Sequence, residues 1–379
     1  MLDLGCDNAC DIAIVGGGPA GSGCAIALRL RFPKWRVMLL EASDYSLPRM
    51  GEVLPALAVH LLRQLRFPLG VLARSGMPAE SIASAWGGAE LAEEHHLFSA
   101  RGAGLHLDRN LFDRRLAEHA ASLGAAAQLE TRLHSVTRKD GCWVLHLSGG
   151  KTCSARFLID ATGRSAIVAR SLGARIRRLD GLTAYSRILR GSNRAEHRTV
   201  VEACALGWWY TAPLPGARRV VSLLTDVDLG RTEGLPDGEA WHRNLRRTQH
   251  VSALLDETAS QHLTTVSSAS TALLSSAVGD GWLATGDAAA SGDPLAGQGI
   301  ARALRSGILA SYAAADALSG RATQGLERYD ALLRAQFASF QRVHFAHHAR
   351  EMRWPDQPFW RRRQGHGDEP RYAEQGAAS

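Results

Sequence analysis

DIAIVGGGPAGSG, residues 11–23, joins a short apolar run to a cluster of glycines that opens a run of small residues. The apolar run at 11–15 is typical of a buried parallel strand, and residues 20–30 are predicted to form the helix that follows it. The glycines between them have the spacing G-x-G-x-x-G, with Gly16, Gly18 and Gly21 at the three glycine positions.

Each glycine of this motif has a mechanical role. The first permits a tight turn, the second lets a pyrophosphate approach the backbone, and the third lets the helix pack closely on the strand. A nucleotide diphosphate is therefore predicted at the helix N-terminus, beside Pro19 and Ala20. A second predicted strand at 35–40 ends in Glu41, twenty residues after Gly21. A carboxylate there accepts hydrogen bonds from both ribose hydroxyls and repels a 2′-phosphate.

GDAAASGDPLAGQGI, residues 286–300, lies 270 residues after the first glycine motif and has nucleotide-binding chemistry of its own. Segments of this kind at both ends of a chain indicate a single cofactor held by both, which is typical of a flavoprotein. Only one G-x-G-x-x-G motif follows a strand, so no separate nicotinamide domain is expected. Electrons are then expected from NAD(P)H bound transiently at the flavin, or from a partner flavin reductase.

Composition narrows the class of protein. The 379 residues are 45% apolar, enough for a large core, and the formal charge is +7. Only Lys34, Lys139 and Lys151 are lysines, so the basic residues are almost all arginine. The arginine clusters at 175–178 and 361–363 lack interleaved aromatic residues and are interpreted as solvated faces. No nucleic-acid partner is expected.

The N-terminus lacks the pattern of a secretory signal, and the best apolar stretch, 299–318, is interrupted by charged residues. The sequence therefore predicts a cytoplasmic protein without a transmembrane segment. Six cysteines show no metal-ligand spacing and are expected to be reduced thiols, mostly buried, so no metal site is predicted.

Between the two glycine segments the chain has an interleaved pattern. Residues 66–105 are interpreted as irregular, and beyond Pro355 a polar tail is expected to be partly disordered. The predicted helices are 55–65, one beginning at an Asp108 N-cap, one around 241–255, and several over 297–350; the predicted strands are 132–138, 142–147 and 155–159, followed by longer alternating strands over 182–275.

Three motifs together carry a family resemblance. The segment 16–21, DATGRS at 160–165 and the segment 286–300 resemble the FAD fingerprints of the p-hydroxybenzoate hydroxylase-like flavoproteins. RMGE at 49–52 and HLDR at 106–109 resemble the branch that holds flavin-dependent halogenases, geranylgeranyl reductases and the flavoproteins that mature tryptophylquinone-containing amine oxidases. The resemblance covers roughly residues 10 to 320 and implies an FAD-dependent oxidoreductase.

The resemblance implies an α/β fold in which a Rossmann-like FAD-binding domain is interleaved with an antiparallel-sheet substrate domain and followed by a helical C-terminus. The expected divisions are 1–180 and 276–320 for the FAD-binding domain, with substrate-domain insertions around 66–105; 181–275 for the substrate domain; 321–354 for a C-terminal helical segment; and 355–379 for the tail.

The resemblance also implies roles for single residues. Asp287, beside Gly286, would bind the ribityl chain, while Asp160 and Gly163 would support the cofactor from the middle fingerprint. Arg109 resembles an arginine that contacts FAD in relatives, with an ordinary helix-start arginine as the alternative; Arg49 would meet the pyrophosphate or flank the flavin. A long helix follows Pro294, Gly297, Gly299 and Ile300, and its N-terminus would stabilise the anionic reduced flavin.

The reaction is narrowed by two departures from the halogenase pattern. Halogenases need a lysine between the Gly-Glu segment and the Asp-Arg helix, and this chain has none between Lys34 and Lys139. Their W-x-W-x-I-P motif is also broken, because the comparable stretch at 208–213 reads WWYTAP. The sequence therefore favours a monooxygenase that transfers oxygen from a flavin C4a-hydroperoxide to an electron-rich aromatic ring.

Candidate pocket residues are aromatic. Trp86, Trp208 and Tyr210 are predicted to line a dry site or to be core aromatics, and Trp208 and Trp209 must face opposite sides of their strand. His106 is the polar candidate, with a structural histidine as the alternative, and no catalytic acid or base is assigned. The substrate remains open between an aromatic small molecule and tryptophan in a peptide or partner protein; an isoprenoid reductase is the alternative, and a halogenase is a less favoured one.

Overall fold

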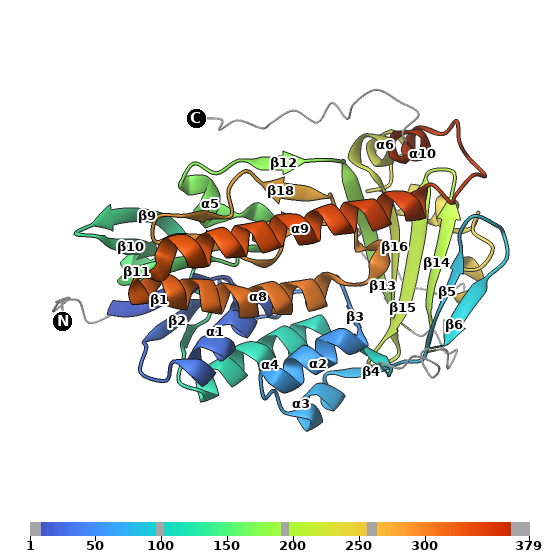
Figure 1. Cartoon of the computed structure of the whole chain (residues 1–379). Helices are drawn as coiled ribbons and strands as arrows, with labels where there is room; N and C mark the ends of the chain where they lie inside the picture. The colour runs from blue at the N-terminus through green and yellow to red at the C-terminus, as the bar shows by residue number, and fades with distance from the viewer. Residues whose placement is uncertain (1–8, 96–101, 191–196, 256–263, 365–379) are drawn as a thin grey trace.

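A computed structural model describes residues 9–95, 102–190, 197–255 and 264–364, and its core is an eight-stranded sheet covered by helices (Figure 1). The central strands run in the order β20-β11-β1-β2-β8 and are all parallel, while β9, β10 and β19 pair antiparallel at the margins. The strands are β1 (Ala9–Val15), β2 (Val37–Leu40), β8 (Ala126–Gln128), β9 (Leu133–Lys139), β10 (Cys142–Leu147), β11 (Thr152–Asp160), β19 (Val278–Gly279) and β20 (Trp282–Ala284).

Helices from both halves of the chain pack together beside this sheet. α8 (Gly299–Asp316) lies along α1 (Pro19–Arg31) on one side and along α9 (Ala322–His348) on the other, with α4 (Arg109–Ser122) next to α1 (Figure 1). The α1–α8 contact is close because its residues are small: a Cβ added at Gly307 would lie 2.2 Å from the carbonyl oxygen of Ala20. This crossing brings the two glycine segments together.

A second, seven-stranded sheet lies at one end of the helical layer, in the order β17-β13-β16-β15-β14-β5-β6 (Figure 1). All its pairings are antiparallel except that of β14 with β5. Its strands are β5 (Ser81–Ala85), β6 (Ala92–His95), β13 (Leu182–Arg190), β14 (Thr199–Cys204), β15 (Gly207–Leu214), β16 (Arg218–Asp226) and β17 (Thr265–Ser268).

The two faces of this sheet have different neighbours. Trp209 packs on one face against Trp241 of α7 (Gly238–Leu245), near α6 (Val227–Thr232). Trp208 packs on the other face with Trp360 of α10 (Pro358–Arg363) and with Leu295. The prediction that the paired tryptophans face opposite sides is confirmed, because side chains alternate along a strand.

Smaller elements connect the two large sheets. One three-stranded sheet contains β3 (Val53–Leu54), β7 (Gly104–Leu107) and β4 (Gly76–Ala79); another contains β12 (Ile176–Arg178), β18 (Ala272–Leu274) and β21 (Ala290–Ser291). The remaining helices are α2 (Ala56–Gln64), α3 (Leu69–Arg74) and α5 (Ile167–Ser171). The first of these sheets lies between the helical layer and the seven-stranded sheet, so it forms the bridge beside the site.

The predicted helices and strands around the fingerprints are confirmed, and three predictions elsewhere are wrong. Residues 66–105 are not irregular, because the described part contains α3, β4, β5 and β6. The tail beyond Pro355 starts with an ordered helix, α10, whose Phe359 and Trp360 are fully buried. Arg363 is not on a solvated face, since it is buried and pairs with Asp226 at 2.6 Å. Residues 365–379, where disorder is predicted, lie outside the described ranges.

The cysteines and the helices add two further observations. Over the described ranges the cysteines are free thiols, buried at Cys10, Cys24, Cys142 and Cys153 and half-buried at Cys204. Within the same ranges, no helix combines the length and the apolar character needed to cross a bilayer.

Candidate functional site

The three fingerprints interlock at the carboxyl ends of the central parallel strands. A Cβ at Gly16, whose φ is +110°, would lie 2.2 Å from the carbonyl oxygen of Ala161 in the middle fingerprint. A Cβ at Gly21 would lie 1.9 Å from the carbonyl oxygen of Gly16, and one at Gly286 would lie 2.7 Å from Ala20 Cβ. The protein itself therefore requires glycine at these positions.

Gly18 and Gly299 have a different environment. A Cβ at either residue would meet no protein atom within 4 Å, and Gly18 has an ordinary φ of −71°. Neither backbone strain nor packing requires glycine there. Both residues lie at the N-terminal ends of helices, α1 and α8, where unpaired N–H groups attract anions. A diphosphate at Gly18 and an anionic ring at Gly299 fit this open space.

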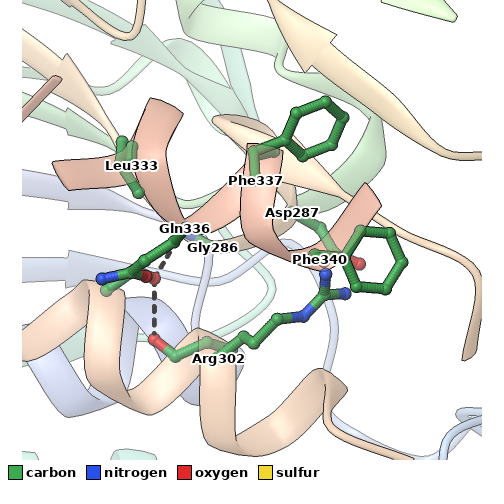
Figure 2. Close-up of a pocket in the computed structure, with 10 residues that line it drawn as sticks. Gly286, Asp287, Arg302, Leu333, Gln336, Phe337 and Phe340 are labelled. Atoms are coloured by element: carbon green, nitrogen blue, oxygen red, sulfur yellow. Dashed lines mark hydrogen bonds between the residues drawn. The ribbon is translucent and has the colours of Figure 1, made fainter. Parts of the chain in front are cut away.

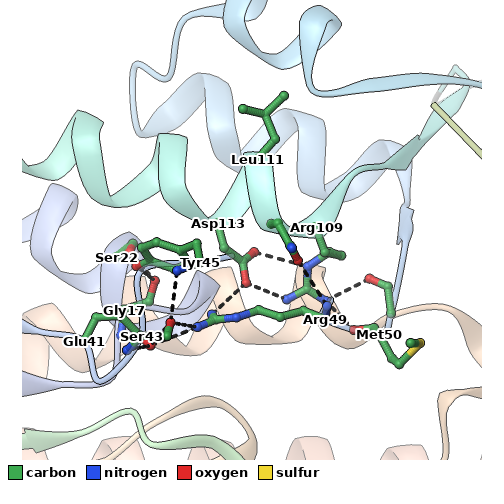
Figure 3. Close-up of polar contacts among 12 residues, drawn as sticks. Gly17, Ser22, Glu41, Ser43, Tyr45, Arg49, Met50, Arg109, Leu111 and Asp113 are labelled. Carbon is green, nitrogen blue, oxygen red and sulfur yellow. Dashed lines mark hydrogen bonds and ion pairs between the residues drawn. The ribbon is translucent and has the colours of Figure 1, made fainter. Parts of the chain in front are cut away.

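Glu41 lies at the end of β2 with its carboxylate beside the first glycine motif (Figure 3). Its Oε2 accepts a hydrogen bond from the backbone N–H of Gly17 at 2.7 Å, and its Oε1 accepts from Ser43 Oγ at 2.7 Å. Tyr45 packs beneath this turn and donates its hydroxyl hydrogen bond to the Gly17 carbonyl at 2.9 Å. Oε2 keeps a second lone pair, which a ribose hydroxyl could use.

Arg49 and Arg109 share the buried carboxylate of Asp113 (Figure 3). Arg49 donates from Nη1 to Asp113 Oδ2 at 3.1 Å and from Nη2 to Glu41 Oε1 at 2.9 Å. Arg109 donates from Nη2 to Asp113 Oδ2 at 2.9 Å and from Nη1 to the carbonyl oxygens of Met50 and Gly51. This network joins the end of β2 to segment 49–51, so Arg49 lies beside Glu41 and Arg109 holds the backbone of that segment.

The middle fingerprint is held by Asp160. Its Oδ1 accepts hydrogen bonds from the N–H and hydroxyl of Thr162 at 2.9 and 2.6 Å, and its Oδ2 accepts from the N–H of Ala169 at 2.8 Å. Burial raises the pKa of this carboxyl although the hydrogen bonds act in the other direction. Asp160 therefore fixes the loop, while Gly163, with φ of +66° and open space around it, remains accessible to a ligand.

Arg164 ties the middle fingerprint to the third. It donates from Nη2 to the carbonyl of Gly292 at 3.0 Å, and its Nε lies 3.4 Å from Asp287 Oδ2. Asp287 also lines a small pocket between α8 and α9, together with Arg302, Phe337 and Phe340 (Figure 2). Burial lowers the pKa of Arg302, whose guanidinium carbon lies 4.9 Å from the centre of the Phe340 ring. The Asp287 carboxylate thus pairs with Arg164 and shares this pocket with Arg302.

The loop between Asp293 and α8 adjoins the segment around Gly51. Pro294–Ala296 forms a single helical turn, and Gly297 ends it in the left-handed region with φ of +60°. A Cβ at Gly297 would touch Val53 Cγ1 at 3.6 Å. The third fingerprint and the Gly51 segment therefore form two neighbouring walls, and Ile300 is buried behind them in the first turn of α8.

Glu52 and Tyr210 lie where these walls meet the seven-stranded sheet. Tyr210 on β15 places its hydroxyl 3.5 Å from Glu52 Oε2. It packs against the same buried clusters of the sheet as Met50 and Leu295 do. Burial raises the pKa of Glu52 and that of Tyr210. Oε1 of Glu52 is buried and has no hydrogen-bond partner among the described residues. A neutral carboxyl group beside an aromatic surface can donate a hydrogen bond there.

The other candidates lie further from this corner. His106 is fully buried, and its Nε2 lies 2.8 Å from Thr199 Oγ1, an arrangement that fits its structural alternative. Trp86 donates its Nε1 hydrogen bond to the carbonyl of His347 at 3.0 Å and packs on Trp360. Trp208 is 1% exposed and lies on the same face of the seven-stranded sheet as Tyr210. Of these aromatic candidates, Tyr210 is the one that contacts Glu52, and it shares a buried cluster with Met50.

Three residues of the site were missed in the sequence: Tyr45, Glu52 and Asp113. Asp113 had a usable signal, because it follows Arg109 by four positions on one helix and such pairs are neighbours. Glu52 was noticed only as part of a resembling segment. Tyr45 gave no signal, since its φ of 64° and its contact with Gly17 depend on the loop after β2.

Comparisons with known proteins agree with this geometry. The family described as FAD binding domain matches residues 9–339. The putative FAD-dependent oxidoreductase LodB of Marinomonas mediterranea is 30% identical over 369 residues, which are 93% of this chain and 96% of LodB. The solved structure of QhpG, a peptidyl tryptophan dihydroxylase essential for tryptophylquinone cofactor biogenesis, is 26% identical with a TM-score of 0.76, covering 97% of this chain and 80% of QhpG. The myxobacterial chondrochloren halogenase CndH shares the fold, with a TM-score of 0.82, 22% identity, and coverage of 94% of this chain and 86% of CndH.

Proposed function

The chain belongs to the FAD binding domain family and is an FAD-dependent oxidoreductase, and from that premise we propose that it is a monooxygenase acting on an electron-rich aromatic ring. The family resemblance predicted from the three fingerprints is confirmed by these comparisons. The observation that carries the proposed reaction is the corner formed by Tyr210, Glu52 and Met50, where an apolar sheet face meets both walls of the cofactor site.

We assign the cofactor contacts to the fingerprints. Gly16, Gly18, Pro19, Ala20 and Gly21 hold the diphosphate, and Glu41 receives the ribose hydroxyls. Asp287 and Gly286 meet the ribityl chain, with Asp160 and Gly163 supporting it. Pro294, Gly297, Gly299 and Ile300 present the N-terminus of α8 to the ring, where the positive helix end stabilises a negative charge. Arg49 and Arg109 act through Glu41 and the Met50–Gly51 backbone.

Bound FAD supplies the reduction of dioxygen and the transfer of one of its oxygen atoms. The ring gains that atom in place of hydrogen as a hydroxyl group, and the second oxygen leaves as water. The balance requires two electrons and two protons. NAD(P)H supplies the electrons and one proton as a hydride, directly or through a flavin reductase, and solvent supplies the other proton. The chain's own contribution is to orient the ring, exclude water and hold a proton at Glu52.

Tyr210 and Met50 supply the apolar surface that keeps this corner dry. A dry site matters because water would release reduced oxygen as peroxide instead of allowing its transfer. Burial raises the pKa of Glu52 and so favours its protonated form, which would donate a hydrogen bond into the corner and add no negative charge opposing a reduced, anionic flavin.

Halogenation is disfavoured by the position of the lysines. Lys34, Lys139 and Lys151 are the only lysines in the chain, and all three are exposed: after α1, in the β9–β10 hairpin and before β11. None belongs to the walls of the cofactor site or to the described part of the seven-stranded sheet, so the nucleophilic lysine that halogenases use has no counterpart here.

Tryptophan within a peptide or partner protein is the substrate that we favour. The support is the similarity to QhpG, whose substrate is peptidyl tryptophan, and to LodB over nearly the whole length of both chains. A free aromatic small molecule is the other form of the same proposal, and a reductase of an isoprenoid double bond is the alternative reaction.

An oxygen-isotope experiment tests the proposal. FAD-loaded protein, reduced without oxygen, is mixed with labelled dioxygen and either free tryptophan or tryptophan-containing peptides of varied sequence. We expect labelled oxygen in the indole ring of at least one peptide, detected by mass spectrometry, with little peroxide released in its presence.

Parallel reactions separate the alternatives. Chloride and bromide are added to one set, and an isoprenoid with an allylic double bond is offered without oxygen in another. A halogenated ring without added oxygen would support a halogenase, and a saturated isoprenoid formed without oxygen would support the reductase. Either product, together with unlabelled peptides and tryptophan, would overturn the monooxygenase proposal.

A further inference from the structure

Three metal-binding side chains meet behind the third fingerprint, on the α9 side of it. Asp293 immediately precedes the turn at 294–296, and His344 and His348 lie four positions apart on α9, so both face the same side of that helix. His344 Nε2 lies 2.7 Å from Asp293 Oδ2, and His348 Nε2 lies 3.7 Å from the same oxygen. Asp293 and His348 are buried, and His344 is half-buried.

The protonation state of His348 follows from its second ring nitrogen. Nδ1 lies 3.1 Å from the backbone carbonyl oxygen of His344, and because a carbonyl only accepts hydrogen bonds, Nδ1 must carry the proton. In the neutral ring Nε2 is then a bare lone pair. It is fully buried and has no hydrogen-bond partner in the part of the chain that the structure describes. It faces Asp293 Oδ2, which is also an acceptor and can accept a hydrogen bond from His344 Nε2 at 2.7 Å. Protein alone therefore leaves two acceptors opposed, and the His348 lone pair has no donor among the described residues.

A divalent cation resolves this opposition. Bonds of 2.0–2.1 Å to a tetrahedral Zn²⁺ separate neighbouring ligand atoms by about 3.3 Å. The two Asp293–histidine separations, 2.7 and 3.7 Å, lie on either side of that value, and all three ligand atoms lie within 4.8 Å of one another. Shifts of about half an ångström would complete the geometry.

We propose that Asp293, His344 and His348 bind a divalent transition-metal ion, with zinc the expected ion and water in the fourth position. Two imidazoles and one carboxylate favour zinc-class ions over calcium or magnesium, which prefer oxygen ligands. The expectation of no metal site came from cysteine spacing, which does not address a His-Asp ligand set.

The surroundings resemble a metal site's outer shell. The Nδ1–H of His348 donates to a backbone carbonyl, which is the usual way in which a ligating histidine is oriented. Asp293 Oδ1 accepts a hydrogen bond from the N–H of Leu295 at 2.9 Å, leaving Oδ2 for the ion. The nearby cation Arg363 is neutralised by its own ion pair with Asp226. Trp86 packs edge-on against His348 and excludes water from that side.

The ion would fasten α9 to the flavin-facing loop. Asp293 belongs to the loop that ends in Gly297 and α8, whereas both histidines belong to the last turns of a 27-residue helix. A metal bond at Asp293 would fix this loop to the C-terminal end of α9. Its role is structural, and it needs no contact with FAD or substrate.

The test measures metal content. Untagged, FAD-loaded protein is expressed with added zinc, freed of loose metal by gel filtration and analysed by inductively coupled plasma mass spectrometry. We expect about one zinc per chain in the wild type and a small fraction of that in His344→Gln and His348→Gln. His347→Gln is the matched control, because His347 lies on the same helix but packs on Trp86 and is not among the three ligands.

Two further readouts keep the result independent of activity. Metal-free wild type loaded with Co²⁺ should show the visible absorption of a tetrahedral site, and competition with a chromophoric chelator should give a Zn²⁺ affinity about 100-fold or more above that of His348→Gln. FAD absorbance and circular dichroism report whether each variant is folded. His344 is half-buried, so His344→Gln should disturb packing less than His348→Gln does. If His348→Gln fails to fold, His344→Gln provides the test of metal binding.

The proposal is overturned by either of two results. One is a wild type that contains no zinc and, when metal-free, binds Zn²⁺ no more tightly than His344→Gln. The other is folded His344→Gln and His348→Gln protein that keeps the wild-type zinc content, which would place the metal elsewhere.

Discussion

Gly18 and Gly16 lie two positions apart in one motif, and different forces require glycine at each. Gly16 has a left-handed backbone and a carbonyl oxygen 2.2 Å from where its Cβ would lie, whereas Gly18 has neither constraint. Folding therefore requires glycine at position 16 but not at position 18, where we assign the requirement to the ligand. The G-x-G-x-x-G pattern alone does not distinguish a glycine that folding requires from one that we assign to ligand binding.

Gly18→Ala is expected to fold and to bind FAD poorly. Without cofactor its free energy of unfolding should fall by no more than about 1 kcal/mol, the cost of a poorer N-cap. FAD affinity should fall about tenfold or more, because the added methyl group lies where the diphosphate approaches. Gly16→Ala is the comparison, with an expected loss of about 3 kcal/mol or more in cofactor-free stability. Urea unfolding and FAD titration measure both; unchanged FAD affinity in Gly18→Ala would contradict the assignment.

Glu52→Gln is expected to change how stability depends on pH. Burial raises the pKa of Glu52 above its ordinary value of 4.5, so the folded state holds the proton more tightly than the unfolded state. The stability that this proton contributes is full below pH 4.5 and is lost as the pH rises through the raised pKa. Glutamine cannot ionise, so the variant does not lose this contribution. Its free energy of unfolding should therefore increase relative to that of the wild type as the pH rises.

Urea unfolding of both proteins between pH 4 and pH 8 checks this, with the exposed Glu94 of β6, changed to glutamine, as the control for losing a surface carboxylate. A difference between wild type and Glu52→Gln that stays constant over this range would show that Glu52 is not held neutral.

Sequence reasoning at this scale depends on local motifs. The fingerprint glycines and Glu41 could be assigned because each acts through its neighbours in the chain or through a fixed spacing. The structure brings them together, and their contacts with FAD stay a prediction. Arg49 and Arg109 were placed near the cofactor without their shared partner, Asp113, since the pairing of Arg49 with Asp113 joins elements 64 positions apart. Long-range pairings of that kind leave no period in the sequence.

At the scale of elements, the crossing of α1 and α8 decides whether the two ends of the chain form one site. Gly307→Ala places a methyl group 2.2 Å from the carbonyl oxygen of Ala20, where backbone must move on one side or the other. We expect a loss of about 2 kcal/mol in stability and a weaker FAD complex, because the two helix N-termini would separate.

Gly70→Ala in α3 is the matched control for this change. Gly70 is exposed, and its added Cβ would meet only Arg74 Nη1 at an ordinary 3.7 Å. Alanine should there raise stability by about 0.5–1 kcal/mol, through helix propensity alone. Thermal unfolding and FAD titration compare the two; a Gly307→Ala protein as stable as Gly70→Ala would contradict the close crossing.

Elements with strong periodicity were predictable, and those formed by pairing across the chain were not. The helix from Asp108 was predicted from its N-cap and its apolar spacing, and Asp108 does accept from the N–H of Leu111. β5 and β6 escaped prediction because they are short and are completed by β14, more than a hundred positions away. Their sequences, SIASA and AEEH, consist mostly of Ser, Ala and Glu and carry little strand propensity by themselves.

At the scale of the whole molecule, α10 joins the C-terminal region to the seven-stranded sheet. Arg363→Met should lower the free energy of unfolding by about 3 kcal/mol, because Asp226 is buried and would lose its best-buried partner. Arg361→Met, on the exposed side of the same helix, should change stability by about 0.5 kcal/mol or less. Equal urea midpoints for the two variants would show that Arg362 alone satisfies Asp226.

The crossing of α1 with α8 also determines when, during translation, both halves of the proposed FAD site are present. A ribosome that has just released β1 and α1, which ends at Arg31, must add about 275 more residues before Gly307 emerges, which takes about 14 to 55 s at ordinary elongation rates. Throughout that interval FAD has only half a binding surface, so the cofactor cannot rescue the nascent N-terminal half from aggregation. Cofactor supply in the cell should therefore act on the released chain, and chaperones on the growing one.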